Sequence, residues 1–535
     1  MLVNQSCNMK NNVDMIIHNG VVYTVDDKFT VTSAVAVENG VVVAVGDDTS
    51  ILNNYKSENI IDLKGKPMYP GFIDGHCHFK SMGENFLRYA DLKGCLSFEE
   101  VVERLKKHAE IIDSEWILGR GWDQNLWENK AFPTNDVLNE LFPDNKVAIT
   151  RVDGHAGLVN DNVLKLMNFD NKSVVDGGEL LKNNDGSLSG ILLDKAYDLV
   201  KEAIPELSEK EMVKALLLAQ DKCFELGLTS VTDAGLSLGE IMMIDSLQKH
   251  GLLKINTNVM MNPDDETLDY FVKNGVLETE KLTVRSVKLY ADGALGSRGA
   301  KLLEPYSDDA DNTGLFVEND DYYQRICEIA YNNGFQVCTH AIGDAAVRKM
   351  LNIYGRFLKE HNDLRWRIEH AQILHPDDFK LFGKYSIIPS IQSTHATSDM
   401  FWAVDRLGVG RLKTSYAQKQ LLAENGWIVS GTDFPIEHIS PIYTFYAAVA
   451  RKNIDRQPVQ GFNMENALSR KEAMQSITIW AAKGCFEENR KGSIEVGKKA
   501  DFVVLDNDIM TIEEADIIQS KVIKLFVDGA VLYEN

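Results

Sequence analysis

The chain has 535 residues, of which 44% are hydrophobic and 25% charged, and a formal net charge of −23 at pH 7. This composition is typical of a soluble globular protein, and the length suits one large barrel with additions better than one ordinary domain. The negative charge disfavours nucleic acids and anionic membrane surfaces as partners, because both require clustered cations, and leaves a small-molecule substrate as the expected partner.

The N-terminal segment, MLVNQSCNMKNNVDM, has no apolar core of the kind that a signal peptide requires. No apolar run along the chain reaches the length of a membrane-spanning helix. The seven cysteines form no C-x-x-C pair, and their odd number disfavours a disulfide framework and suits a reducing compartment. We therefore expect a cytoplasmic protein.

Both ends of the chain contain short strand-like segments. These segments are residues 14–25, 33–46, 500–505 and 521–533. Three of these segments enclose an Asn-Gly or Asp-Gly pair, which predicts a hairpin. The two ends could form separate β units, but chain termini often lie close together. We favour one composite β-sandwich built from residues 1–67 and 490–535.

Between the ends, residues 68–95 and 206–489 alternate strand-like and helical segments, which indicates parallel βα units. The eight candidate strands are residues 68–78, 226–233, 254–261, 285–292, 335–340, 364–370, 387–392 and 427–433. Eight such units predict an α/β fold of the (β/α)₈ TIM-barrel type. Catalytic groups of such barrels lie at the C-terminal ends of the strands.

Residues 96–205 are too many for one loop between two barrel strands. This stretch contains its own strand-like pieces, residues 116–121 and 146–152, and a turn-rich segment at 182–190. It predicts an inserted subdomain after the first barrel strand, over the barrel mouth.

His76 and His78 stand at the end of the first predicted strand, in PGFIDGHCHF. The two-residue period of a strand places both imidazoles on one face, where they can bind one divalent cation, and turns Cys77 away as a core thiol. A His-x-His pair alone is often structural. The neighbouring Gly71 and Gly75 at a strand end favour a metal site.

His340 and His370 follow successive apolar strands and precede helices. A single histidine in such a place is more often a satisfied core residue, but two at equivalent positions indicate a shared site. Asp433 follows a strand of the buried type in WIVSGTDFP, where a carboxylate is costly unless it is paired or bound to a metal.

Lys288 lies within the fourth predicted strand, on the same face as Tyr290 and Asp292. Two interpretations remain open. The lysine interacts with Asp292 inside the barrel, or it is carboxylated and its carbamate bridges two metal ions.

Six motifs follow one another along the chain: PGFIDGHCHF, RVDGHAGLVN, VKLYADGALGSRGA, THAIGDAAV, RIEHAQ and SGTDFPIEHISP. With GSIEVGKKADFVVLD near the C-terminus, they resemble the amidohydrolase superfamily over nearly the whole chain, and within it the subgroup that contains N-substituted formamide deformylase. One departure is Ser393 in IQSTHATSD, where that subgroup has proline. It leaves His395 without an assigned role.

The resemblance implies one or two divalent metal ions. Their ligands would be His76, His78, His340, His370 and Asp433, and Lys288 matches the bridging carbamate of binuclear members. Imidazole and carboxylate ligands suit zinc first, with manganese, iron or cobalt as alternatives.

The expected reaction is hydrolysis of a C–N bond in an amide, formamide or related small molecule. A metal-activated water would attack the carbonyl carbon, with Asp433 as general acid and base. The same site could cleave an ester, lactone or phosphoester, and a non-catalytic metal- or ligand-binding protein is the remoter alternative. A homodimer is the default expectation for its assembly.

Four further residues are candidates for substrate contact, each beside a structural alternative. His155 could donate to the substrate carbonyl or bond to its own loop. Trp122, near Trp127, could form an apolar wall or pack in a core. Arg298 could meet an anionic group of the substrate or a structural carboxylate, and Asp292 shares the face of Lys288.

Overall fold

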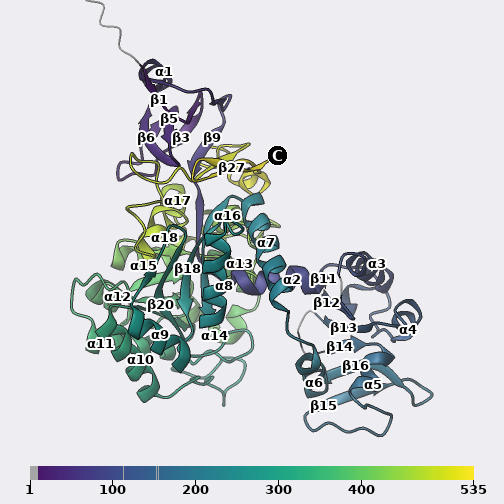
Figure 1. Ribbon diagram of the computed structural model, residues 1–535. Helices are drawn as coiled ribbons and strands as arrows, with labels where there is room; N and C mark the ends of the chain where they lie inside the picture. The colour runs from purple at the N-terminus through teal and green to yellow at the C-terminus, as the bar shows by residue number, and fades with distance from the viewer. Residues whose placement is uncertain (1–9, 113, 152–153, 155) are drawn as a thin grey trace, which may run out of the picture. The chain divides into compact units, whose positions relative to one another are not determined.

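The computed structural model describes residues 10–112, 114–151, 154 and 156–535. The chain forms two compact units, one of Met1–Phe79 with Gln220–Asn535 and one of Lys80–Ala219. Figure 1 labels their helices and strands. None of the helices in the described ranges is long and apolar enough to cross a membrane.

The first unit is built around a parallel sheet whose strands follow one another in chain order. They are β10 (Phe72–Cys77), β17 (Leu228–Leu236), β18 (Asn256–Met261), β20 (Leu282–Tyr290), β21 (Gln336–Ala341), β22 (Arg367–His370), β23 (Ile388–Ile391) and β24 (Val429–Ser430), with the short β19 (Leu277–Glu278) beside β20. All eight predicted barrel strands are confirmed. The first prediction was too long, because residues 67–70 form a separate strand, β9 (Pro67–Pro70), in another sheet.

The barrel is closed by backbone hydrogen bonds between β10 and the segment that follows β24. The Asp433 N–H donates to the His76 carbonyl oxygen at 2.8 Å, and the His78 N–H donates to the Phe434 carbonyl oxygen at 2.8 Å. First and last strands therefore meet, as the (β/α)₈ prediction requires.

Two glycines allow this close approach. A Cβ atom on Gly75 would lie 2.2 Å from Val429 Cγ1, and one on Gly431 would lie 2.4 Å from the His76 nitrogen. The buried Asp74 carboxylate reinforces the junction, since it accepts hydrogen bonds from the Thr432 hydroxyl at 2.7 Å and the Thr432 N–H at 3.1 Å. Side chains larger than glycine would force the two strands apart.

Helices connect the strands and cover the outside of the barrel (Figure 1). They are α8 (Leu238–Lys249), α9 (Asp265–Asn274), α10 (Asp320–Asn333), α11 (Asp344–Phe357), α12 (Phe379–Tyr385), α13 (Ser393–Asp399), α14 (Ala403–Leu412), α15 (Gln418–Asn425), α16 (Pro441–Ala450), α17 (Arg470–Ser476) and α18 (Ile479–Gly484). Local sequence sets several of their ends. Ser237 and Glu240 form a capping box on α8, Asn319 caps α10, and Gly334 ends α10 in the left-handed conformation.

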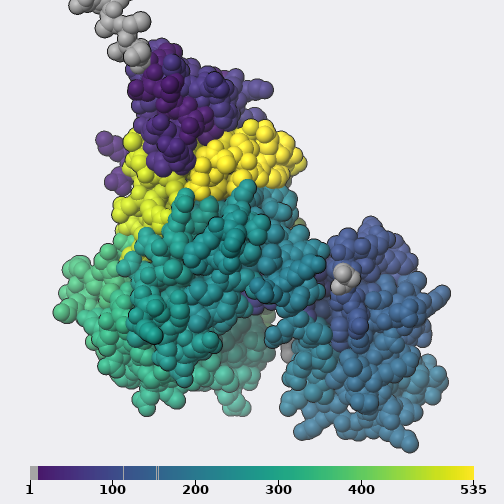
Figure 2. All heavy atoms as spheres, viewed as in Figure 1, coloured from purple at the N-terminus to yellow at the C-terminus, as the bar shows by residue number. Residues whose placement is uncertain are grey.

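Both chain ends contribute to a pair of sheets outside the barrel. One sheet has the order β6 (Val41–Gly46), β5 (Ala34–Glu38), β2 (Met15–His18), β8 (Ile60–Asp62); the other has the order β27 (Ala530–Glu534), β26 (Val522–Val527), β25 (Phe502–Leu505), β9, β3 (Val21–Tyr23), β4 (Val31–Thr32). Val35 of the first sheet and Phe502 of the second belong to one buried cluster. Figure 2 shows the N-terminal residues in purple against the C-terminal residues in yellow. The composite sandwich is confirmed.

The hairpin predictions have different outcomes. Asn39-Gly40 and Asp528-Gly529 join antiparallel neighbours, with positive φ at all four residues, as a type I′ turn requires. The prediction for Asn19-Gly20 was wrong. Only Asn19 has a positive φ, and the chain there crosses from β2 in one sheet to β3 in the other, so that each strand covers its own side of the shared core.

The second unit contains a six-stranded sheet with its own core. Its order is β11 (Tyr89–Asp91), β12 (Trp116–Trp122), β13 (Lys146–Arg151), β14 (Ala156–Val159), β16 (Leu188–Asp194), β15 (Gly178–Lys182), with helices α3 (Phe98–Ala109), α4 (Asp136–Leu141), α5 (Asp161–Leu166) and α6 (Lys195–Ala203). The predicted strand pieces at 116–121 and 146–152 correspond to β12 and β13. Separate buried clusters on the sheet show that this part has a hydrophobic interior of its own.

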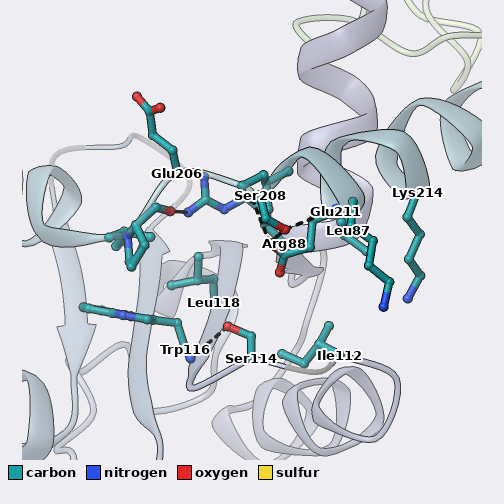
Figure 3. Close-up of a pocket in the computed structure, with 14 residues that line it drawn as sticks. Leu87, Arg88, Ile112, Ser114, Trp116, Leu118, Glu206, Ser208, Glu211 and Lys214 are labelled. Atoms are coloured by element: carbon teal, nitrogen blue, oxygen red, sulfur yellow. Dashed lines mark hydrogen bonds between the residues drawn. The ribbon is translucent and has the colours of Figure 1, made fainter. Parts of the chain in front are cut away.

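A cavity of about 480 Å³ lies within this second unit (Figure 3). Two of its charged side chains are hydrogen-bonded within the unit: Arg88 donates to the Pro205 carbonyl oxygen, and Glu211 accepts from the Ser208 hydroxyl at 2.6 Å. Trp116 and Leu118 of β12 line its apolar side. Among the described residues, none of the predicted metal ligands or substrate contacts lines it.

Candidate metal centre

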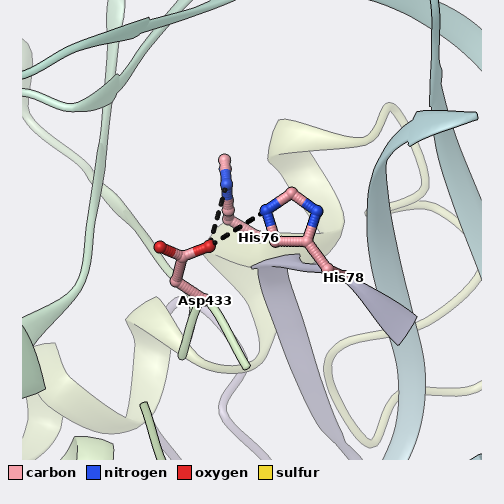
Figure 4. Close-up of side chains that lie close together, drawn as sticks. All are labelled: His76, His78 and Asp433. Atoms are coloured by element: carbon pink, nitrogen blue, oxygen red, sulfur yellow. Dashed lines mark ion pairs between the residues drawn. The ribbon is translucent and has the colours of Figure 1, made fainter. Parts of the chain in front are cut away.

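The five predicted ligands meet at the C-terminal ends of the barrel strands. His76 Nε2 and His78 Nε2 lie 3.5 Å and 3.3 Å from Asp433 Oδ1 (Figure 4). The His370 ring lies 5.0 Å from that of His76 and 4.5 Å from that of His340, centroid to centroid. Strands that are separated widely in the sequence therefore contribute to one cluster.

Cys77 is turned away from this cluster, as the strand period predicts. Its side chain is buried, and its Sγ lies 3.3 Å from the Thr232 carbonyl oxygen. The six cysteines in the described part of the chain are free and buried, and Cys7 lies outside it. These six described thiols contribute no ligand to the cluster.

Three imidazoles are oriented by acceptors on their Nδ1 atoms. His76 Nδ1 lies 2.5 Å from Glu369 Oε2, His78 Nδ1 lies 3.1 Å from the Ala234 carbonyl oxygen, and His370 Nδ1 lies 2.7 Å from Gln392 Oε1. These contacts place the ring proton on Nδ1 and leave a lone pair on Nε2. That tautomer is the one a metal ligand needs.

Burial keeps the deeper imidazoles neutral. Burial, together with the Lys288 ammonium, lowers the pKa of His76 to about 4 and that of His340 to about 3. The pKa of His370 also falls well below its ordinary value, through burial and the neighbouring His340. Neutral imidazoles are required for metal binding, so these residues are ready as ligands near neutral pH.

A buried ion pair lies beside the cluster and orients one of its histidines. Glu369 Oε1 lies 2.8 Å from Arg367 Nε, and neither side chain is exposed. Burial alone would raise the pKa of Glu369, but Arg367 and His76 lower it well below its ordinary value. Glu369 is therefore an ionised acceptor that orients His76.

His395 joins the site, although the sequence left it without a role. Its Nε2 lies 3.3 Å from Asp433 Oδ2, and its Nδ1 lies 3.1 Å from Glu437 Oε1. Burial favours the neutral ring, but the two carboxylates outweigh burial and raise the pKa of His395 to about 10. His395 is consequently a cationic donor that holds Asp433 ionised.

Two groups of ligand atoms lie close enough together to hold one ion: His76, His78 and Asp433, and His370, His395 and Asp433, each within 4.8 Å. Both nitrogens of the protonated His395 carry hydrogen and face carboxylates, which makes the second group the poorer set of donors. The geometry favours the group of His76, His78 and Asp433.

The first group also fits a cation on electrostatic grounds. The lone pairs on His76 Nε2 and His78 Nε2 face Asp433 Oδ1 at 3.5 Å and 3.3 Å, so three electron-rich atoms point at one another. The buried His340 Nε2 has no hydrogen-bond partner in the described ranges. A divalent cation would satisfy such an arrangement, and imidazole nitrogen with carboxylate oxygen is a donor set that zinc accepts.

Lys288 lies inside the barrel beside this cluster. Its side chain is buried, and its Nζ lies 3.2 Å from His76 Nε2 and 5.1 Å from the Tyr290 ring centroid. Asp292 is engaged elsewhere: its carboxylate accepts the backbone N–H groups of Ile342, Gly343 and Lys301 at 2.8 to 3.0 Å. The structure thus brings Lys288 to the predicted ligands and not to Asp292.

The remaining candidates lie as follows. Trp122 is fully buried in the core of the second unit, and its Nε1 donates to the Ile149 carbonyl oxygen at 3.0 Å. Arg298 pairs with Asp308 at 2.9 Å. Both residues thus adopt the structural alternative. His155 lies outside the described residues.

Comparison with known proteins gives a consistent result. Residues 59–533 match the model of the amidohydrolase family. The chain is 31% identical to YtcJ of Bacillus subtilis (strain 168), which is classed as an amidohydrolase, over 97% of this chain and 99% of that protein. It is 24% identical to the N-substituted formamide deformylase of Arthrobacter pascens over 98% of each.

The fold agrees with the sequence comparison. A crystal structure of an uncharacterized metal-dependent hydrolase from Pyrococcus horikoshii OT3 matches with a TM-score of 0.77 at 30% identity, over 94% of this chain and 99% of that one. Together with the family model, which spans most of the chain, these matches bear out the resemblance seen in the motifs. The chain belongs to the amidohydrolase family.

Proposed function

We propose that this protein is a metal-dependent hydrolase that cleaves a C–N bond in a small amide, formamide or related molecule. The observation that carries the proposal is the cluster of His76, His78 and Asp433 at the barrel mouth, whose ligand atoms lie within 4.8 Å of one another. Such a cluster at the C-terminal ends of barrel strands is where enzymes of this architecture place their chemistry.

The proposed ligands are His76, His78 and Asp433, with His340, His370 and a carboxylated Lys288 available for a second ion. A bound divalent cation, zinc in the first instance, supplies Lewis acidity that lowers the pKa of water and polarises a carbonyl oxygen. The residues of the chain supply orientation and proton transfer.

Asp433 is the proposed general acid and base. His395 holds its Oδ2 at 3.3 Å, which leaves Oδ1 facing the site, ionised and able to accept a proton. Burial alone would raise the pKa of Asp433, but the hydrogen bond from His395 lowers it well below its ordinary value. The carboxyl group can then release the proton to the leaving nitrogen.

The names of two relatives support a C–N bond as the target. One is an N-substituted formamide deformylase that matches this chain over almost its whole length. Another is classed as an amidohydrolase. A formamide or similar amide is accordingly the first substrate class to test.

We expect the purified protein to contain one or two divalent ions per chain and to hydrolyse members of an amide panel. The protein is expressed in zinc-supplemented medium and assayed for metal by elemental analysis. N-substituted formamides, other small amides and their matched esters are then compared as substrates.

Chelation should abolish turnover, and Zn²⁺, Mn²⁺ or Co²⁺ should restore it, because the ligands are present without the ion. Faster hydrolysis of esters than of the matched amides would assign the site to the other bond class. A protein that binds no metal and gains no activity from any of the three ions would refute the proposal.

Lys288→Ala is expected to lose metal and to turn over roughly tenfold more slowly or worse, as for a residue that supports a metal site. Burial lowers the pKa of Lys288, so the neutral amine forms more readily than at an exposed lysine. A neutral amine can add to CO₂: the N–C bond forms, one N–H proton leaves, and an anionic carbamate results.

The carbamate is tested by reconstituting metal-free protein with zinc in CO₂-depleted buffer, with and without bicarbonate. Bicarbonate should raise the metal content and turnover of the wild type but not of Lys288→Ala. Lys222→Ala, at an exposed lysine that pairs with Glu225 at 2.8 Å, serves as the control. Equal reconstitution of the wild type under both conditions would show that Lys288 acts without carboxylation.

A further inference from the structure

A small cavity beside His370 borders a buried arginine that forms no ion pair within the described part of the chain. Its polar lining includes Gln372, Gln392, His395, Tyr416, Gln418 and Arg451. The space open to the centre of a water-sized sphere is about 10 Å³. A sphere of that size can enter but has little room to move, so the cavity admits a small particle and not part of a substrate.

Arg451 follows α16, and its side chain is 0% exposed. Its Nε donates to the Phe462 carbonyl oxygen at 2.9 Å. Its two terminal nitrogens, Nη1 and Nη2, have no hydrogen-bond partner, and no carboxylate in the described ranges forms an ion pair with it. A buried cation of this kind requires compensation by negative charge.

Gln392 adds a third unmatched donor. Its Oε1 lies 2.7 Å from His370 Nδ1, while its buried Nε2 has no partner in the described part of the chain. The neighbouring glutamines are satisfied, since Gln372 Nε2 donates to Asp399 at 3.0 Å and Gln418 Nε2 donates to the Ala448 carbonyl oxygen at 3.2 Å. The unmatched groups around the cavity are thus all N–H donors.

A water molecule fits such a lining poorly, because it carries two hydrogens that also need acceptors. A monatomic anion accepts hydrogen bonds from every side and offsets the charge of Arg451. We propose that this cavity binds one monatomic anion of the halide class, with chloride as the ordinary occupant. The proposal concerns the structure of the protein and does not depend on the reaction proposed above.

The anion would also determine the orientation of a predicted metal ligand. By accepting from Gln392 Nε2, it keeps Oε1 turned towards His370 Nδ1, which places the ring proton on Nδ1. With the amide reversed, Nε2 would donate to Nδ1, and the proton would move to the ring nitrogen that faces the site. The halide therefore favours the tautomer of His370 that can bind a metal.

The direct test uses crystals of the full-length wild-type protein grown with sodium bromide. Diffraction is measured at the bromine absorption edge. The expected result is one anomalous peak per chain between Arg451 and Gln392. A bromide position elsewhere only, or none at all, would overturn the proposal.

Denaturation provides the test in solution. At fixed ionic strength and fixed metal content, gluconate is replaced stepwise by bromide or chloride. At a halide concentration of about 100 times Kd, the folding equilibrium constant of the wild type should rise about a hundredfold. Arg451→Met should lose this dependence, whereas Arg456→Gln, at an exposed arginine five residues further on, should keep it.

Two outcomes contradict the proposal: a wild type whose stability is the same in halide and gluconate, or an Arg451→Met variant with an undiminished halide response. If Arg451→Met does not fold, Arg451→Gln replaces it, and the bromide crystals of the wild type decide the question without any variant.

Discussion

Replacing Asp433 by asparagine is expected to lower kcat by about 10²- to 10⁴-fold, the usual cost of losing a positioned acid–base group. The amide has nearly the same size as the carboxylate and can still accept the hydrogen bond from His395, which lies 3.3 Å from Oδ2. It cannot take up the proton. KM should therefore change little, which is the pattern of an interaction made in the transition state.

The measurement is steady-state kinetics with elemental analysis of the same sample, because Asp433 is also a proposed ligand. Only variants that retain metal are compared. Asp245→Asn is the matched control, since this aspartate is buried on α8 and pairs with Lys249 at 2.6 Å. It should keep kcat within a few-fold. An Asp433→Asn enzyme with full kcat and metal would remove Asp433 from the mechanism.

Arg367→Met is expected to destabilise the metal-free protein by about 3 to 5 kcal/mol, the typical effect of leaving one partner of a buried ion pair uncompensated. The guanidinium lies 2.8 Å from Glu369 Oε1 and donates to the Gly75 carbonyl oxygen at 2.6 Å and to the Ser390 hydroxyl at 3.0 Å. Methionine keeps much of the volume but removes the charge. Urea denaturation after chelation measures the change without a contribution from bound metal.

Two comparisons separate the charge effect from general damage. The double variant Arg367→Met/Glu369→Gln should recover part of the loss, because no unpaired charge remains in the barrel. Lys222→Met breaks an ion pair with Glu225 at the surface and should shift stability by about 0.5 kcal/mol or less. An Arg367→Met protein within about 1 kcal/mol of the wild type would show that Glu369 is compensated by other groups.

The fold could be predicted largely because its signals are local. Most barrel strands contain a short apolar run between turn residues, which is recognisable without knowledge of the neighbouring strands. The Asn19-Gly20 turn shows the limit of this approach. Its two residues match a hairpin turn as well as Asn39-Gly40 does, but the choice between the two outcomes depends on which sheet each flanking strand joins.

The residues of the candidate site also fall into those that the sequence could predict and those that it could not. His76, His78, His340, His370 and Asp433 could be found because they end strands and because the motifs resemble a known family. The side chains that contact these residues could not be found from the sequence. Glu369 precedes His370 in the chain yet orients His76, and His395 contacts Asp433 from α13. Such pairs depend on distances between strands, which no spacing along the chain expresses.

Two buried charges in one short strand were nevertheless a signal that could have been used. Arg367 and Glu369 lie two residues apart in RIEH, so they share one face of the strand. Charges in such a place need partners, and the nearest candidates were the imidazoles predicted for the same barrel. That argument would have indicated Glu369 as a support for the metal centre.

Barrel closure also constrains the order of events during synthesis. His76 and His78 leave the ribosome early, whereas Asp433 and the Thr432 contact to Asp74 come from the last strand and its loop. A nascent chain that ends before residue 433 has the four proposed histidine ligands but lacks the carboxylate that completes the proposed site. If these residues bind metal as proposed, we expect tight uptake to wait until nearly the whole barrel has been translated, which would limit capture of the wrong ion by partly made chains.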